Sequence, residues 1–120
     1  MADLEQRAEI LDPKVIESLK ELGGEDDPEL FDELVDLFCE DSPQRIQKMV
    51  EALDAGDWMR VEGMAHALRS SSANLGAMRL SALCRDIEAQ AKTGSHVEAA
   101  EMVRRAPSEY QRVADALRRA

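Results

Sequence analysis

Aromatic residues, cysteines and long hydrophobic runs are all scarce in this sequence. Aromatic residues make up 3% of its 120 residues and β-branched residues are few, so a fold built mainly from strands is disfavoured. No apolar run approaches the roughly 20 residues that a membrane helix needs, and no signal peptide precedes the first acidic residues. The two cysteines, Cys39 and Cys84, lie in apolar helical patterns without a short-spaced motif, which predicts two buried free thiols. These absences together predict a cytoplasmic protein with no membrane partner.

Positively charged residues are also fewer than negatively charged ones. The chain has 15 lysines and arginines against 25 acidic residues, which gives a formal net charge of −10. Such a surface repels the phosphate backbone of nucleic acids as well as anionic membranes, so neither is an expected partner. The length corresponds to one domain. We therefore expect a single helical domain over residues 11–120, preceded by a mixed polar segment, residues 1–10, that frays or forms a short turn.

The residues that are abundant favour an all-α fold, because Ala, Leu, Glu, Arg and Met are good helix formers. Capping residues and glycines divide the chain into one short helix and four longer ones. The expected helices cover residues 11–24, 27–57, 57–75, 77–94 and 95 to the end. Short glycine-containing turns between them predict an antiparallel up-down four-helix bundle, with the short N-terminal helix packed across one end.

Aspartates and prolines refine this prediction. Asp12 and Asp57 stand directly before helical patterns, where an aspartate side chain caps the first backbone N–H groups. Pro43 lies inside the second expected helix and predicts a bend or a loosened turn near residues 39–43. Pro107 lies inside the last one and predicts a kink or a restart of that helix.

One histidine stands on the wrong side of its helix to be a core residue. Successive helical residues are about 100° apart, which places His66 about 150° from the centre of the apolar stripe and toward solvent. That stripe consists of Val61, Met64, Ala65, Leu68, Ser72 and Leu75. The neighbours of His66 along its own face include Gly63 and Ser70, which leave the ring clear. Glycine inside a helix costs about 1 kcal/mol relative to alanine, and packing alone offers no reason for it here.

The sequence around His66 excludes most of the usual roles of a functional histidine. No Ser, Cys or Asp partner stands at the spacing of a catalytic triad. Metal binding is disfavoured because a paired Glu-x-x-His signature is missing and the only other histidine, His96, is expected in a surface loop after the fourth helix. A neutral imidazole is a good nucleophile toward phosphoryl groups, so His66 is the candidate phosphoryl acceptor. No glycine-rich phosphate loop is present, so the chain is not expected to make phosphohistidine from ATP.

The segment HALRSSSANLGA, residues 66–77, resembles the signature of histidine phosphotransfer (HPt) domains, roughly His-x-Leu-Lys-Gly-Ser-Ser-x-x-Leu-Gly-Ala. The segment LSALCRDIE, residues 80–88, is similar to the next helix of that family, and ALDAGDW, residues 52–58, to its preceding turn. The resemblance extends over about residues 28–118. It implies a protein that accepts a phosphoryl group from a receiver-domain aspartate and passes it to another receiver.

The resemblance also implies roles for individual residues. His66 matches the phosphorylated histidine, and Arg69 matches a basic position that helps to hold the phosphoryl oxygens. Lys92 falls where some members have a second basic residue, although an ordinary lysine at a helix end explains it equally well. Ser70 departs from the glycine that is usual beside the histidine, but it is still small and its hydroxyl could hydrogen-bond a phosphoryl oxygen. Glu88 is expected to face the same region, at a position where some members have glutamine instead.

The partners follow from the same resemblance. They are the receiver domains of a hybrid sensor histidine kinase and of a response regulator, and the carrier itself is expected to be a monomer. No cofactor of its own is expected, because Mg²⁺ would arrive with the receiver domain. Docking would use the exposed faces of the second and third helices, with the first helix contributing and Val15, Ile16 and Met59 at the edge. The alternative is a non-catalytic helical adaptor that binds a signalling partner through the same face.

Overall fold

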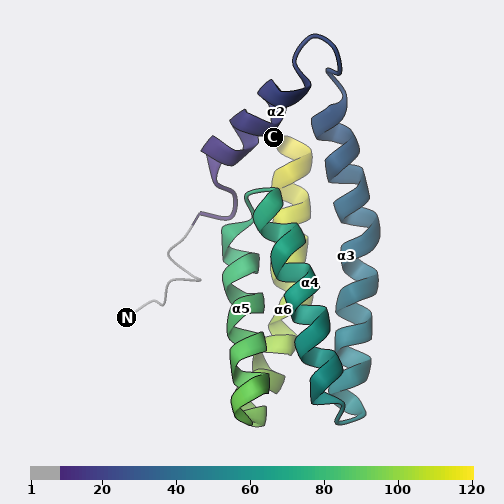
Figure 1. The fold of residues 1–120 in the computed structure, drawn as a ribbon, viewed down its shortest axis with the longest axis vertical. Helices are drawn as coiled ribbons and strands as arrows, with labels where there is room; N and C mark the ends of the chain where they lie inside the picture. Colours follow the sequence, from purple (N-terminus) through teal and green to yellow (C-terminus); the bar gives the residue numbers. More distant parts are fainter. Residues whose placement is uncertain (1–8) are drawn as a thin grey trace.

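A computed structural model describes residues 9–120, which form five helices and no strands (Figure 1). The helices are α2 (Pro13–Gly23), α3 (Leu30–Asp54), α4 (Trp58–Asn74), α5 (Met78–Thr93) and α6 (His96–Arg119). The all-α prediction is confirmed. Most of the N-terminal segment predicted to fray, residues 1–8, lies outside the described residues.

The four long helices lie side by side and alternate in direction (Figure 1). Each of α3 and α5 packs against both α4 and α6, so the four helices enclose one core. The short α2 crosses one end of this bundle and contacts α3. Within residues 9–120, no helix combines the length and the apolar character that a membrane crossing requires.

The helix boundaries follow the local signals. The Asp12 side chain accepts a hydrogen bond from the Lys14 backbone N–H at 3.0 Å, and Pro13 is the first residue of α2. The Asp57 side chain accepts one from the Arg60 N–H at 3.2 Å. Both predicted N-caps are therefore confirmed.

The two internal prolines do not end their helices. Helix α3 continues through Pro43 and α6 continues through Pro107, so the predicted restart at Pro107 is wrong. A proline removes only one helical hydrogen bond, and a helix that packs along its whole length in a bundle tolerates that loss. The core that holds both helices contains the fully buried Met49 and Val103. Cys84 is also fully buried, whereas Cys39 is only partly buried, and the two cysteines do not form a disulfide.

The N-terminal helix is fixed to the turn between α4 and α5. The Asp12 backbone N–H donates a hydrogen bond to the Gly76 carbonyl at 2.7 Å. Gly76 has φ +74°, and a Cβ added there would lie 2.9 Å from the Val15 Cβ, so both the conformation and the close approach require glycine. Ile16 is 8% exposed and belongs to the core, which corrects its predicted place at the edge of the docking surface. Its side chain packs with the hydrophobic core of the bundle.

Candidate functional site

His66 lies on the exposed side of α4. Its side chain is 57% exposed, while the stripe on the opposite side of the helix faces the core. Val61, Ala65 and Leu68 in that stripe have no exposed surface. The predicted orientation of His66 is therefore confirmed. A ring in this position is open to a second protein.

One nitrogen of the ring is held by the neighbouring helix. The Nδ1 atom of His66 lies 3.0 Å from Oε1 of Glu88, which α5 brings against α4. Glu88 is buried, with a side chain only 11% exposed. Within the described part of the chain, Nε2 has no hydrogen-bond partner. Nε2 is therefore the ring nitrogen that is left without a contact.

Arg69 completes a three-residue cluster, one turn after His66 on α4. Its Nη2 lies 3.1 Å from His66 Nδ1, and its Nη1 lies 3.3 Å from Oε2 of Glu88. The Arg69 side chain is 33% exposed, so the guanidinium is accessible from solvent. The Ser81 hydroxyl on α5 donates a hydrogen bond to the Arg69 carbonyl at 3.3 Å and ties this turn of α4 to α5. Two predicted site residues, His66 and Arg69, thus meet at one carboxylate.

The contacts at Nδ1 assign the proton of the ring. A neutral imidazole nitrogen carries either a proton or a lone pair, so only one of Glu88 and Arg69 hydrogen-bonds it at a time. A lone pair at Nδ1 would face an oxygen of the buried Glu88 carboxylate at 3.0 Å, and two hydrogen-bond acceptors repel each other. The longer and more exposed Arg69 side chain can shift while it keeps its pair with Glu88. We therefore assign the proton to Nδ1, donated to Glu88, and the lone pair to Nε2.

The surroundings of the ring are open. A Cβ added at Gly63 would have no neighbouring atom within 4 Å, so packing does not require glycine at this position of α4. Met59 is 83% exposed and lines a shallow hollow beside the ring together with Glu62, Gly63 and Glu88. Ser70, one turn after His66, is exposed as well. The small residues flanking His66 leave room for an approaching partner.

The structure does not bring Lys92 to His66. The Lys92 Nζ lies 3.6 Å from Oε1 of Glu62, and the Lys92 side chain is 60% exposed. Glu62 lines the hollow beside the ring, so Lys92 lies at its margin, paired with another residue. A role for Lys92 toward a phosphoryl group stays a prediction.

His96 does not lie in a loop, which corrects the prediction. It is the first residue of α6, and its ring stacks on Trp58, the first residue of α4, with centroids 3.9 Å apart and an interplanar angle of 10°. The sequence places these residues far apart, and the antiparallel bundle brings the two helix starts together. Within residues 9–120, no group of three or more His, Cys, Asp or Glu side chains is arranged to hold a metal ion.

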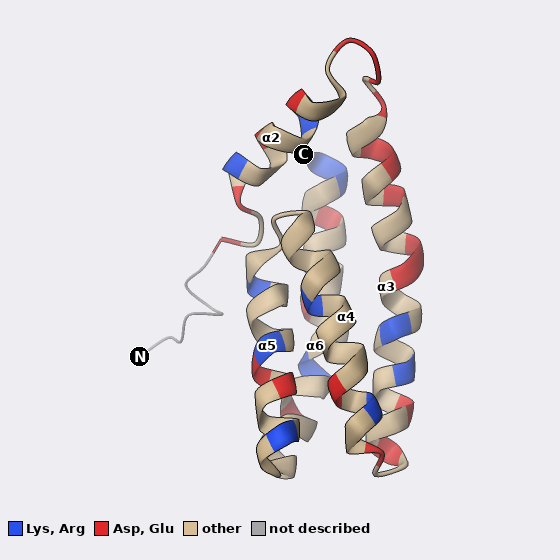
Figure 2. Ribbon diagram, viewed as in Figure 1, with Lys and Arg blue, Asp and Glu red and all other residues tan. Residues whose placement is uncertain are grey.

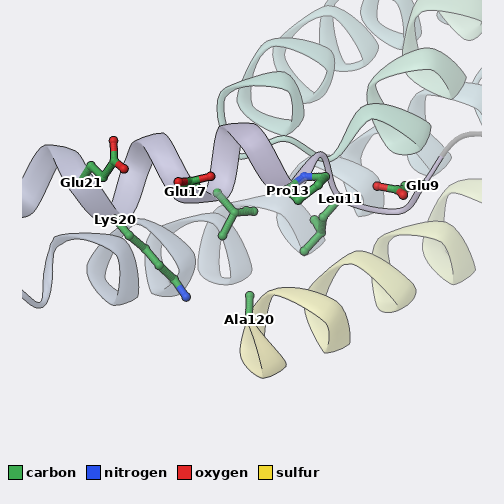
Figure 3. Close-up of a pocket in the computed structure, with 8 residues that line it drawn as sticks. Glu9, Leu11, Pro13, Glu17, Lys20, Glu21 and Ala120 are labelled. Carbon is green, nitrogen blue, oxygen red and sulfur yellow. The ribbon is translucent and has the colours of Figure 1, made fainter.

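A larger hollow lies at the other end of the molecule, between α2 and the end of α6 (Figure 3). Its apolar lining comes from Leu11, Pro13, Ile16 and Ala120, and it is also lined by four charged residues, Glu9, Glu17, Lys20 and Glu21. None of the candidate site residues lines it. A residue that receives a group carried by another protein needs exposure rather than depth, so the size of a hollow does not locate this site.

Glu88 is the site residue whose contact the sequence did not predict. The sequence predicts only that Glu88 faces the same region as His66, at a position where some family members have glutamine. A further signal was present: Glu88 directly follows Ile87, in a helix whose apolar stripe includes Cys84 and Ala91. A carboxylate at the margin of a buried stripe needs a partner with a donor or a positive charge.

The family model of the Hpt domain matches residues 33–119, well over half of the chain. This chain belongs to the Hpt domain family. The match includes the whole of the His66, Arg69 and Glu88 cluster. No curated protein matches the chain significantly.

Two solved structures are similar to this Hpt domain. Histidine-containing phosphotransfer protein B (HptB) from Pseudomonas aeruginosa PAO1 is 31% identical in sequence, with a TM-score of 0.84. The alignment covers 93% of this chain and 94% of the HptB chain. A rice protein described as a histidine-containing phosphotransfer protein is 21% identical in sequence, with a TM-score of 0.79. The alignment covers 91% of this chain and 79% of the rice chain. The rice structure shows the shared fold alone.

Proposed function

We propose that this Hpt domain is a phosphoryl carrier that accepts a phosphoryl group on Nε2 of His66 from a receiver-domain aspartate and passes it to a second receiver. One observation carries the proposal. His66 is 57% exposed on α4 while its Nδ1 contacts the buried Glu88 at 3.0 Å, so Nε2 is the open nitrogen. Family membership and the similarity to HptB support the same function.

The transfer step follows from this geometry. The Nε2 lone pair attacks the phosphorus of the aspartyl phosphate, a nitrogen–phosphorus bond forms, and the bond to the aspartate oxygen breaks. The aspartate leaves with the electron pair as a carboxylate. Transfer to the second receiver reverses these changes. Phosphoryl transfer depends mainly on alignment and on neutralising the charge of the phosphoryl oxygens.

The chain supplies part of that charge and alignment. Arg69 lies next to the ring and is partly exposed, so its guanidinium can reach phosphoryl oxygens on Nε2. Glu88 fixes the ring orientation through Nδ1. The phosphorylated aspartate and the Mg²⁺ ion would come with the receiver domain, so the complete reaction centre forms only in the complex.

The partner surface lies on the exposed faces of α3 and α4 around His66. Met59 beside the ring is 83% exposed and would give this surface an apolar contact point. Figure 2 shows acidic residues gathered on the N-terminal half of α3 and on the turn before it. Receiver domains of a hybrid sensor kinase and of a response regulator would dock here with a monomeric carrier, through a transient interface.

Label transfer tests the proposal. A panel of receiver domains, each phosphorylated with radiolabelled acetyl phosphate and freed of excess reagent, is mixed with the wild-type protein and with His66→Gln. Label that moves to the wild type, is acid-labile and base-stable, and is absent from His66→Gln supports the function. Receivers that bind without transferring label indicate the adaptor instead. Acid-stable label would place the modification on a serine.

A further inference from the structure

The Glu88 contact has a second consequence once His66 carries a phosphoryl group. The attacking ring already holds a proton at Nδ1, so bond formation at Nε2 leaves a ring with a positive charge. Glu88 Oε1 lies 3.0 Å from that proton-bearing nitrogen, and its side chain is only 11% exposed. A hydrogen bond from a cationic ring to a carboxylate is stronger than one from a neutral ring.

We propose that Glu88 holds the Nδ1 proton on the phosphorylated ring and thereby keeps His66 ready for onward transfer, an inference that rests on the proposed function. In onward transfer the nitrogen–phosphorus bond breaks and its electron pair returns to Nε2. A ring that still has its Nδ1 proton leaves as a neutral imidazole. A ring that has lost it must leave as an imidazolate anion, which is a far poorer leaving group. Glu88 acts as a positioning residue, since it acts through Nδ1 of the ring and not on the phosphorus.

The other charged groups near the ring are consistent with this role. On α4, the Arg69 guanidinium faces Nδ1, where its charge opposes the proton, but its pairing with Glu88 and its exposure let it move toward the phosphoryl oxygens. Glu62 on α4 and Lys92 on α5 pair with each other at 3.6 Å, and the ion pairs and hydrogen bonds of the His66 ring are with Glu88 and Arg69. Within residues 9–120, no charged side chain of α3 forms a hydrogen bond or ion pair with His66. Glu88 is therefore the group that decides where this proton stays.

Glutamine is the informative substitution at this position. Its amide oxygen accepts a hydrogen bond from Nδ1–H in the same place but carries no charge. The matched control is Glu109→Gln on α6. Glu109 has the same 11% side-chain exposure and pairs with Arg79 at 2.8 Å and Arg112 at 2.6 Å. Glu109→Gln removes an equally buried, paired carboxylate away from the ring.

The first experiment measures onward transfer against pH. The wild type, Glu88→Gln and Glu109→Gln are phosphorylated by one receiver, purified, and mixed with excess unphosphorylated receiver and Mg²⁺ in single-turnover reactions. We expect the Glu88→Gln rate to fall relative to the wild-type rate as the pH rises from about 6, and to be on the order of tenfold lower at about pH 8. Glu109→Gln should follow the wild type throughout, since every reaction uses the same receiver.

Superimposed profiles, or a Glu88→Gln rate lowered by the same factor at every pH, would overturn the inference. Absence of label on His66 of the wild type would instead overturn the proposed function. A second measurement needs no variant: ¹⁵N NMR of the phosphorylated wild type reports whether Nδ1 carries a proton. We expect the proton to remain at a higher pH than in free 3-phosphohistidine, and loss at the same pH would refute the role of Glu88.

Discussion

The Tyr110 hydroxyl on α6 donates a hydrogen bond to the backbone carbonyl of Cys39 on α3, at 3.3 Å. Pro43 stands four residues after Cys39 and has no N–H, so this carbonyl lacks its helical partner. The tyrosine supplies the missing donor from a neighbouring helix. The Phe38 and Tyr110 rings also pack together, with centroids 5.9 Å apart. A proline inside α3 is thus compensated across the bundle.

Tyr110→Phe should destabilise the protein without changing its fold, because the ring packing stays and only the donor to Cys39 is lost. We expect the free energy of unfolding to fall by about 1 kcal/mol, measured by urea denaturation at neutral pH. Restoring a residue with an N–H at position 43 should shrink the effect, so Pro43→Ala with Tyr110→Phe makes a double-mutant cycle. An additive cycle would show that the two residues are not coupled.

The same hydroxyl predicts a pH dependence of stability. Burial, and then the neighbouring Cys39, raise the pKa of Tyr110 from its ordinary value of 10.0 to about 12. The folded protein therefore holds this proton at pH values where the unfolded chain has lost it. The resulting stabilisation is complete below pH 10.0 and is lost as the pH rises toward 12. Unfolding curves between these limits should decline more steeply for the wild type than for Tyr110→Phe; parallel declines would contradict the assignment.

His66→Gln should leave the melting temperature nearly unchanged. The side chain is 57% exposed and its main contact is Glu88, to which the glutamine amide can donate in place of Nδ1–H. Thermal unfolding followed by circular dichroism measures this. A drop in stability of several kcal/mol would mean that the ring is structural. In that case, loss of phosphoryl acceptance in the variant would no longer identify the acceptor.

Arg69→Ala should slow phosphoryl transfer and lower the yield of phosphohistidine without blocking receiver binding. The guanidinium acts on charge that is present only when the phosphoryl group is near, so its removal affects the reaction more than docking. Single-turnover rates and calorimetric binding constants separate the two effects. Arg85→Ala, which removes an exposed arginine from α5, is the control. Equal rates in Arg69→Ala and the wild type would exclude Arg69 from the site.

Ser70 gives a steric test, because it is exposed one turn after His66 on the same face of α4. Ser70→Gln should keep or raise the melting temperature, since glutamine is a better helix former, yet obstruct the approach to Nε2 and slow transfer. Ser70→Gly should keep or raise the transfer rate at a small loss of helix stability. Ser108→Gln on α6 adds the same bulk away from the ring. A wild-type transfer rate in Ser70→Gln would refute the argument from small neighbours.

The features predicted correctly from the sequence depend on residues close together in the chain. Asp12 and Asp57 cap helices that begin one residue later, and the orientation of His66 follows from the turn of a single helix. The features missed depend on how two helices meet. The contact between His66 and Glu88 joins residues 22 positions apart. Side-chain pairs of this kind depend on the rotation of each helix about its axis and on the register between helices, which local patterns leave undetermined.

The predictions that Ile16 lies at the edge of the docking surface and that His96 lies in a loop were wrong for the same reason. Ile16 belongs to a short helix whose exposed and buried sides are decided by the end of the bundle that it crosses. His96 gains its place in α6 and its stacking on Trp58 from a helix start that the sequence marks only weakly. In both cases the partner surface is assembled from distant segments of the chain.

The ring contact at Nδ1 also determines the regiochemistry of the modified histidine. Imidazole offers two nitrogens, and a free histidine can be phosphorylated on either one to give two distinct isomers. Here one nitrogen faces a buried carboxylate and the other faces solvent. A phosphoryl group on His66 would be the 3-phosphohistidine isomer alone. An antibody specific for 3-phosphohistidine should therefore recognise the modified protein, and one specific for 1-phosphohistidine should not.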